Sequence, residues 1–481
     1  MRKKIWVYIT GMLLIIIICA GVFVSTGQEQ VTAFVDVTLI PMTEEKVVPG
    51  QTVLVQGGEI IEIGPVDEIQ VSNRFQVIDG SGKYLLPGLA DMHMHTRQDW
   101  DDQTLWPVSP LALYLANGVT TIRDLGPTGN VITFPLEWQD EIEAGTRIGP
   151  RIFTSGKILF SSPHKDPAGL VLMNHEQGFD FLKVYSYVSG PDYYRAMWQA
   201  RELGMYTVGH IPYAVGLEGT LAGGMDEIAH VEELIYEFFN FERHQVLSPA
   251  EWTPVIIQSA LEEYDFSAEE FLGKFIDKNG SVMEDLTALL LEYDAPVSTT
   301  MTVDAIVVMK NYQKEEFLAR PENIYFEIGY LDSYLDGNEK HLNQCRGVEE
   351  VCAAKAAIDL WILRELHKAD VALVLGTDAG TGGMGIVPGH SVHDELEILL
   401  ENGFSSYEAL ETATVNAALV ADQMTGEGDF GMIAERYRAD LLLVEDNPLE
   451  DISTLRNPLG VMVSGEWYSR SALQKLIEID E

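Results

Sequence analysis

The sequence contains few basic residues. Across 481 residues, 31 lysines and arginines stand against 74 aspartates and glutamates, which gives a formal net charge of −43 at pH 7. Binding to nucleic acid needs a basic surface that neutralises phosphates, so this imbalance excludes nucleic acid as an expected partner. An acidic surface of this kind keeps a protein soluble and suits a medium in which salt screens the repulsion between like charges.

Cysteine is also scarce, with three residues in the chain. Cys19 lies within an apolar run, whereas Cys345 and Cys352 belong to the later part of the chain. On one continuous helix these last two would lie about 10 Å apart, which is too far for a disulfide. Free thiols and a disulfide are equal alternatives here, so cysteine usage does not indicate a compartment.

One long stretch near the N-terminus lacks charge altogether. Four residues with three basic side chains precede an apolar run from Ile5 to Val24. About twenty residues at helical rise cover about 30 Å, enough to cross a bilayer, and no Ala-x-Ala cleavage site follows. We expect residues 1–27 to form a transmembrane anchor that leaves the rest of the chain outside the cytoplasm, periplasmic or extracellular. The alternative is a signal segment and secretion after its cleavage.

Two kinds of sequence pattern follow this segment, one typical of β-sheet and one typical of βα repeats. Residues 31–86 contain short β-type runs separated by turn signals such as Gly57-Gly58, and residues 428–481 return to the same pattern. Residues 87–427 alternate apolar strands with amphipathic segments, which indicates repeated βα units. We therefore expect an α/β fold: a (β/α)8 TIM-like barrel over 87–427, and a small β-sandwich domain formed jointly by the two terminal segments. The acidic and aromatic residues 231–296 are predicted to be an insertion beside the barrel mouth.

Polar residues occupy the ends of the predicted barrel strands. His93 and His95 follow an apolar run, and on a strand residues i and i+2 point to the same side. Later predicted strands carry further polar residues at or near their ends: Lys183, His210, His230 and Asp378. Each has an ordinary explanation by itself, as a solvated lysine, a hydrogen-bonded histidine or a turn aspartate. Because chemistry in such barrels sits at the C-terminal strand ends, their joint placement favours a metal site.

These residues, in this order, resemble the metal-dependent amidohydrolase superfamily. Within it the chain is similar to the imidazolonepropionase-like and Xaa-Pro dipeptidase (prolidase) branch. The resemblance runs from about Val37 to Val463 and includes the Gly376-Thr377-Asp378-Ala379-Gly380 motif. It also includes the segments 393–399, 408–418 and 439–452.

The resemblance implies a centre of two divalent metal ions. His93, His95 and Asp378 match the ligands of the more buried ion, and His210 and His230 match those of the second. Lys183 matches a lysine that takes up carbon dioxide to become a carbamate and bridges both ions, because a carbamate supplies two anionic oxygens. Histidine nitrogens suit Zn²⁺, with Mn²⁺, Co²⁺ and Fe²⁺ left open.

The implied activity is hydrolysis of amide or peptide-like C–N bonds in dipeptides or N-acyl amino acids. A metal-bridging hydroxide is the expected nucleophile, and Asp378 is the expected catalytic acid and base. His164, Tyr185 and Tyr213 are candidate substrate-binding residues, with packing roles as the alternative. The expected partners are a small-molecule substrate and, through the N-terminal segment, the membrane; a homo-oligomer is left open.

Two other functions compete with this one. The first is a mononuclear deaminase or an imidazolonepropionase-type cyclic amide hydrolase. It is disfavoured because Ile211-Pro212-Tyr213-Ala214, directly after His210, contains no glutamate of the kind that such deaminases carry, and because Lys183 would have no role. The second is a non-catalytic, membrane-tethered binding protein, for which burying six polar ligands without a metal would be costly.

Overall fold

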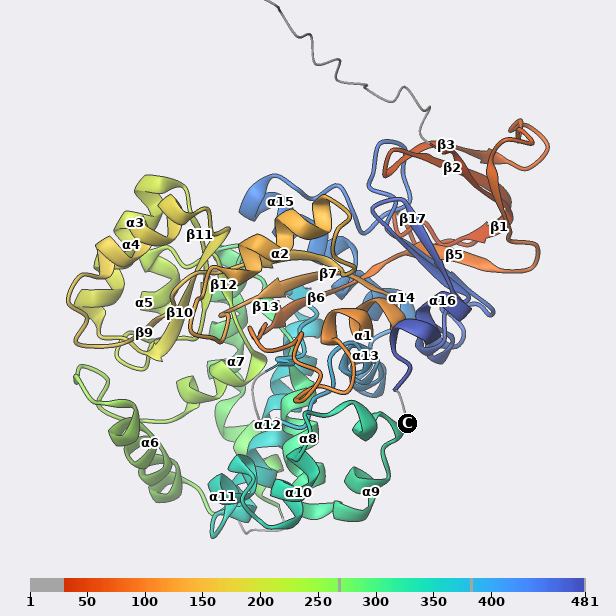
Figure 1. The fold of residues 1–481 in the computed structure, drawn as a ribbon. Helices are drawn as coiled ribbons and strands as arrows, with labels where there is room; N and C mark the ends of the chain where they lie inside the picture. Colours follow the sequence, from red (N-terminus) through yellow and green to blue (C-terminus); the bar gives the residue numbers. More distant parts are fainter. Residues whose placement is uncertain (1–29, 267–269, 381–383, 480–481) are drawn as a thin grey trace, which may run out of the picture.

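The computed structural model describes residues 30–266, 270–380 and 384–479. A smaller β part lies beside a larger α/β part, and it brings together the first and last coloured segments of the chain (Figure 1). The larger part carries the strand ends at which the predicted ligands lie.

Strands from both ends of the chain share one sheet. These strands are β1 (Thr32–Leu39), β2 (Val48–Gln56), β3 (Glu59–Pro65), β4 (Gln76–Asp79), β5 (Tyr84–Pro87), β15 (Leu441–Val444), β16 (Gly460–Val463) and β17 (Glu466–Ser469). Their order is β17-β16-β15-β5-β1-β2-β3, and β4 pairs with β1. The joint between the two segments is the antiparallel pair of β15 and β5, in which Leu441 lies opposite Pro87. Phe34, Val37 and Met462 lie in the buried core of this sheet, so neither segment completes that core by itself.

The larger part is a barrel of parallel strands. They are β6 (Leu89–Met94), β7 (Val119–Asp124), β8 (Arg151–Thr154), β9 (Leu159–Ser161), β10 (Phe181–Tyr187), β11 (Tyr206–Gly209), β12 (Glu227–Ile228), β13 (Val297–Ser298) and β14 (Leu373–Val374). Neighbouring strands pair in chain order, and a bridge between Ser155 and Phe181 joins the strands on either side of β9. A parallel bridge between Met94 and Ala379 closes the ring, and the His95 amide donates to the Ala379 carbonyl oxygen at 2.8 Å. Every residue of β6, β7 and β11 is buried, polar ones included, because both faces of these strands are covered.

Helices connect and cover these strands. They are α1 (Pro110–Ala116), α2 (Phe134–Glu143), α3 (Pro167–Gln177), α4 (Gly190–Leu203), α5 (Gly216–Gly223), η1 (Val231–Phe238), α6 (Pro249–Glu263), α7 (Phe271–Glu292), α8 (Met301–Tyr312), α9 (Lys314–Ala319), η2 (Pro321–Tyr325), α10 (Tyr330–Leu335), α11 (Lys340–Cys345), α12 (Glu349–Lys368), α13 (His390–Glu401), α14 (Ser406–Thr412), α15 (Val415–Thr425), η3 (Ile452–Arg456) and α16 (Arg470–Leu476). The predicted insertion 231–296 contains η1, α6 and α7. A second helical segment, α8 to α12, follows β13 and was not separated from the barrel repeats by the sequence pattern.

The β10–α4–β11 unit shows how the sequence positions the site. Ser189, in an extended conformation, precedes α4, and Gly204 ends it with a φ of 64° that favours glycine. Between them, Tyr193, Met197 and Ala200 recur at helical spacing and are buried. The helix returns the chain to β11, which pairs in parallel with β10 and so places the end of β11 beside the Lys183 strand.

The predicted α/β barrel with its β domain is confirmed, but the predicted membrane anchoring is not. Within the ranges that the structure describes, no helix combines the length and apolarity needed to cross a membrane. The longest, α7, has 22 residues but carries charges such as Lys274, Asp277 and Glu284, which makes it a covering helix of the barrel. The predicted anchor, residues 1–27, lies outside the described residues. The membrane-anchored localisation outside the cytoplasm is therefore corrected.

Candidate metal centre

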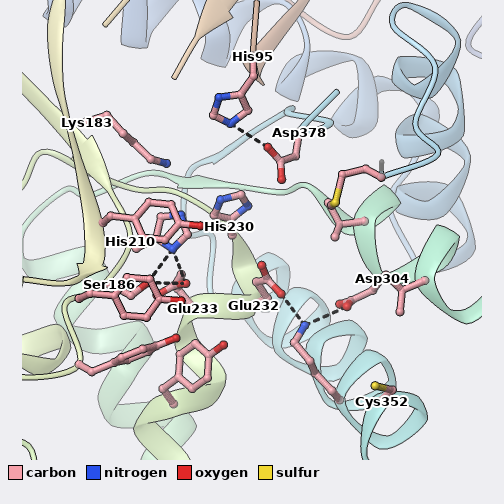
Figure 2. A pocket seen from close by; sticks show the side chains of 18 of the residues that line it. His95, Lys183, Ser186, His210, His230, Glu232, Glu233, Asp304, Cys352 and Asp378 are labelled. Carbon is pink, nitrogen blue, oxygen red and sulfur yellow. Dashed lines mark hydrogen bonds and ion pairs between the residues drawn. The ribbon is translucent and has the colours of Figure 1, made fainter. Parts of the chain in front are cut away.

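The predicted ligands converge on one cavity of about 400 Å³ at the C-terminal ends of the barrel strands. Figure 2 shows His95, Lys183, His210, His230 and Asp378 around this space. These five side chains line the cavity. The sixth predicted ligand, His93 on β6, is buried and its ring centroid lies 4.2 Å from that of His230.

His93, His95 and Asp378 form a compact group of donors. The Nε2 atoms of His95 and His93 lie 3.0 and 3.8 Å from Oδ1 of Asp378. Burial lowers the pKa of His93 well below its usual range. Burial raises the pKa of Asp378, but the hydrogen bond from His95 and the nearby positive charges outweigh it, so the net pKa is lowered. Burial lowers the pKa of His95, but the hydrogen bond to Asp378 and the charges of Asp378 and Asp124 outweigh it, so the net pKa is raised. His93 therefore offers a neutral imidazole and Asp378 an ionised carboxylate, the forms that bind metals.

The second group of donors lies across the cavity. The ring centroids of His210 and His230 are 4.8 Å apart. Burial lowers the pKa of His230 to about 3 and that of His210 well below its usual range, so both are neutral. Lys183 is 1% exposed, and its Nζ has no hydrogen-bond partner. Burial lowers the pKa of its amine to about 7, which makes the neutral amine accessible near neutral pH.

Hydrogen bonds fix the orientation of His210. Its Nδ1 lies 2.8 Å from Oγ of Ser186 and 2.7 Å from Oε1 of Glu233 (Figure 2). Burial and the neighbouring Glu232 raise the pKa of Glu233 to about 8. Contacts at Nδ1 leave Nε2 as the nitrogen that can bind an ion. Sequence reasoning missed Glu233, although its position three residues after His230, in a pair of glutamates, was a usable signal.

Contacts at Nδ1 orient His230 and His95 in the same way as His210. Nδ1 of His230 lies 2.9 Å from Oγ1 of Thr300, and Nδ1 of His95 lies 3.0 Å from the carbonyl oxygen of Gly126. Three residues of the site have a backbone in the left-handed region, with φ of 74° at His230, 50° at Thr300 and 57° at Asp378. Such strain in non-glycine residues concentrates at functional sites, where it aims side chains that regular strands would point elsewhere.

The predicted substrate-binding residues are placed differently. Tyr185 and Tyr213 line the cavity, and the Tyr185 ring stacks on His210 with centroids 4.0 Å apart. His164 is not among the residues that line it. The backbone amide of His164 donates to Asp192, and its ring Nδ1 accepts from the amide of Asp166, in the loop before α3. Sequence reasoning missed two further lining tyrosines, Tyr187 and Tyr236; the first follows Tyr185 at i+2 on β10.

A cluster of charged residues lies on the side of the cavity that is lower in Figure 2, away from His95 and Asp378. The Nζ of Lys355 on α12 lies 2.6 Å from Glu232, 2.9 Å from Asp304 and 2.7 Å from Asp359. These carboxylates are close enough together to suggest a cation site. The ammonium of Lys355 already occupies that position, so the cluster is an ion-pair network.

A disulfide also lines the cavity. Cys345 ends α11 and Cys352 lies in the first turn of α12, and the two are bonded with Cα atoms 6.0 Å apart. The sequence left thiols and a disulfide open, because one continuous helix would have separated the two residues. The chain turns between the two helices instead, which brings them together.

The donors fit divalent metal ions. Both ring nitrogens of His93 and the Nζ of Lys183 are buried without hydrogen-bond partners, which is costly unless another group satisfies them. Four imidazoles with one carboxylate, and a lysine able to become a carbamate, form the mixed nitrogen and oxygen set that first-row metals and Zn²⁺ accept. The identity of the metal and the carboxylation of Lys183 stay predictions.

Comparisons with known proteins bear on this site. Residues 299–468 match the model of the amidohydrolase family. The ochratoxinase of Aspergillus niger is 26% identical over 421 residues, covering 78% of this chain and 73% of the ochratoxinase. The structure of that ochratoxinase has a TM-score of 0.59 at 18% identity, covering 92% of this chain and 96% of the other. A Xaa-Pro dipeptidase with bound methionine in its active site has a TM-score of 0.62 at 20% identity, covering 92% and 100%. At these identities the two structures show a shared fold.

Proposed function

We propose that this chain, whose residues 299–468 match the amidohydrolase family model, is a binuclear metal-dependent hydrolase of amide or peptide-like C–N bonds. The observation that supports this proposal is the convergence of five donors around the buried amine of Lys183, which has no hydrogen-bond partner. His93, His95 and Asp378 would hold one ion, and His210 and His230 the other. Carboxylated Lys183 would lie between them.

Divalent ions in such a site supply Lewis acidity, which lowers the pKa of water and polarises a carbonyl group. The protein supplies the proton transfers. Asp378, whose Oδ1 lies 3.0 Å from Nε2 of His95, would accept a proton from the attacking water and deliver it to the leaving nitrogen. The water oxygen adds to the carbonyl carbon, and the C–N bond then breaks with the proton from Asp378 on the nitrogen. The remaining proton of the new acid passes to the amine, so the products are a carboxylate and an ammonium.

Dipeptides and N-acyl amino acids are the proposed substrates. The similarity to a Xaa-Pro dipeptidase supports the first class, and N-acyl amino acids contain the same scissile bond. A cavity of about 400 Å³ is of the size that encloses a small molecule of this kind.

Metal content tests the binuclear site. We expect purified protein loaded with Zn²⁺ to retain about two ions per chain by elemental mass spectrometry, and the Lys183→Ala variant to retain about one or fewer. Lys368→Ala removes an exposed lysine from α12 and serves as the control, which should keep the wild-type content. One ion in both wild type and Lys183→Ala would contradict the proposal and favour the mononuclear alternative.

A substrate panel tests the reaction class. The metal-loaded enzyme should release free amino acids from dipeptides or N-acyl amino acids, and Asp378→Asn should lower kcat by at least about a hundredfold. If Asp378→Asn retains its metal, its lower kcat comes from lost proton transfer and not from lost metal binding. Activity confined to aminopurines, aminopyrimidines or cyclic amides would overturn the proposed substrate class.

A further inference from the structure

We propose that the cavity wall below the metal donors binds a cationic group of the substrate, an ammonium or a guanidinium. This wall comprises Tyr185, Tyr187, Tyr213 and Tyr236 together with Glu232 and Asp304. The inference rests on the proposed function, since it names the class of substrate for the same site.

The first support is the charge of the wall. Glu232 on η1 and Asp304 on α8 line the cavity with side chains 27% and 14% exposed, so an occupant can reach their carboxylates. In Figure 2 they lie on the lower side of the view, whereas His95 and Asp378 lie on the upper side. With Asp359 behind them, three carboxyl groups share the single ammonium of Lys355. Burial raises the pKa of Asp359 well above its usual range, so its carboxyl adds no charge here. The carboxylates of Glu232 and Asp304 against one ammonium still leave the wall with a formal negative charge that a cation would neutralise.

The second support is a continuous row of tyrosine rings. The ring centroids are 5.5 Å apart for Tyr185 and Tyr187, 5.8 Å for Tyr187 and Tyr213, and 4.9 Å for Tyr213 and Tyr236. The row starts at His210, on which Tyr185 stacks, and so leads away from the metal donors. Tyrosine faces attract cations through the negative charge at the centre of the ring. The cavity thus offers a cation both carboxylates and aromatic rings among its lining residues.

Among the described residues of this wall, no basic side chain is available to bind an anionic group of a substrate. Among the described residues that line the cavity, the basic side chains are Lys183 and Lys355. Lys183 is assigned to the metals, and Lys355 is already bonded to three carboxylates. A substrate carboxylate placed here would lie among like charges, which costs free energy in a partly desolvated site. The net charge of −43 acts in the same direction, because it concentrates cations near the protein.

Binding of small probes tests the charge preference without turnover. The full-length, metal-loaded protein is titrated by calorimetry with n-pentylamine and pentan-1-ol, which share an alkyl chain and differ in charge. We expect the amine to bind at least about tenfold more tightly than the alcohol. Binding of the amine that is equal to or weaker than that of the alcohol would overturn the inference.

Asp304→Asn tests the carboxylate contribution. Asparagine keeps the size of the side chain and an oxygen that accepts from Lys355, so the network stays connected while one charge is lost. The preference for amine over alcohol should fall at least about threefold. Asp394→Asn is the matched control, because Asp394 on α13 also pairs with a cation, Arg456, but does not line the cavity. Equal effects of both substitutions would contradict the assignment to this wall.

Matched dipeptides separate this inference from the proposed function. Alanyl-lysine is compared with alanyl-norleucine, and lysyl-alanine with norleucyl-alanine, so that either end of the substrate can meet the wall. We expect kcat/KM to favour lysine at least about tenfold in one of the two pairs. Hydrolysis of all four with no preference would contradict the inference and leave the proposed function standing. Amine binding without hydrolysis of any dipeptide would support the inference and contradict the proposed substrate class.

Discussion

At the scale of single residues, the neighbours of the ligands decide whether the centre is ready to bind an ion. His210 has Ser186 and Glu233 at its Nδ1, and His230 has Thr300 at the same atom. These contacts set which ring nitrogen faces the cavity before any ion arrives. Glu233 is therefore as informative about the centre as the ligands themselves.

Replacing Glu233 tests this orientation. Glu233→Ala should weaken retention of the metal on the His210 side about 10–100-fold, measured by competition with a chelating dye, because the imidazole loses its fixed orientation. Glu233→Gln should stay within about threefold of wild type, since its carbonyl oxygen still accepts from Nδ1. Glu218→Ala, an exposed glutamate of α5, is the control. Loss of metal in Glu233→Gln equal to that in Glu233→Ala would show that charge, and not orientation, is required.

Asp180 should give the protein a measurable pH dependence away from the metal centre. Burial raises the pKa of this carboxyl to about 6, although it accepts from the Thr154 amide and from Gln139. Between about pH 4 and 6 the folded state holds a proton that the unfolded state has released, so stability falls as pH rises through this window. Asp180→Asn should remove that fall, which is roughly 3 kcal/mol, in urea unfolding. Exposed Asp336→Asn is the control, and an unchanged pH slope in Asp180→Asn would contradict the prediction.

At the scale of elements, close packing of β10 against β11 sets the distance between Lys183 and His210. Gly209 ends β11 beside Val184, and a Cβ atom there would lie 2.1 Å from the Val184 carbonyl oxygen. No side chain fits without separating the two strands. The glycine is needed here for this close approach of two backbones.

Gly209→Ala should therefore lower both stability and metal retention. We expect a loss of about 2 kcal/mol or more in unfolding free energy, together with reduced metal content, because the strands that carry Lys183 and His210 move apart. Gly273→Ala on α7 meets no atom within 4 Å and should be neutral or slightly stabilising. A Gly209→Ala protein with wild-type stability and two ions would refute the strand-spacing argument.

The sequence predicted elements well where periodicity was strong. Strands such as Thr120–Asp124 and Arg151–Thr154 lie within or at β7 and β8, because apolar runs buried on both faces leave a clear pattern. The helices α8 to α12 were not foreseen, since several are short and an amphipathic pattern of a few residues resembles any loop. The membrane prediction used the apolarity of residues 1–27 alone, and those residues lie outside the described ranges.

At the scale of the whole molecule, charge is the dominant physical trait. A net charge of −43 makes the folded state repel itself, and salt screens this repulsion. Tm should rise by several degrees between about 0.05 and 1 M NaCl, over which the screening length shortens from more than 10 Å to about 3 Å. NaCl and KCl at equal ionic strength should act alike. A Tm that is constant or falls with salt would contradict this expectation.

The candidate site was more predictable from sequence than its surroundings. His93, His95, Lys183 and Asp378 could be found because each lies in or shortly after a predicted barrel strand, and a closed barrel brings the C-terminal ends of its strands to one face. Glu232 and Asp304 could not be placed, because they come from segments inserted between strands, whose path no periodicity fixes. The disulfide depended on a turn between α11 and α12 that the sequence did not specify.

The contacts between β6 and the segment after β14 affect when a newly made chain can bind metal. Translation delivers His93 and His95 early and Asp378 late, and the Thr377 and Asp378 amides bond to the His93 carbonyl oxygen only when the ring closes. An unfinished chain therefore presents incomplete ligand sets to every ion that it meets. The proposed centre would be complete only with the last barrel strand, so we expect metal to be acquired after synthesis, once the barrel has closed.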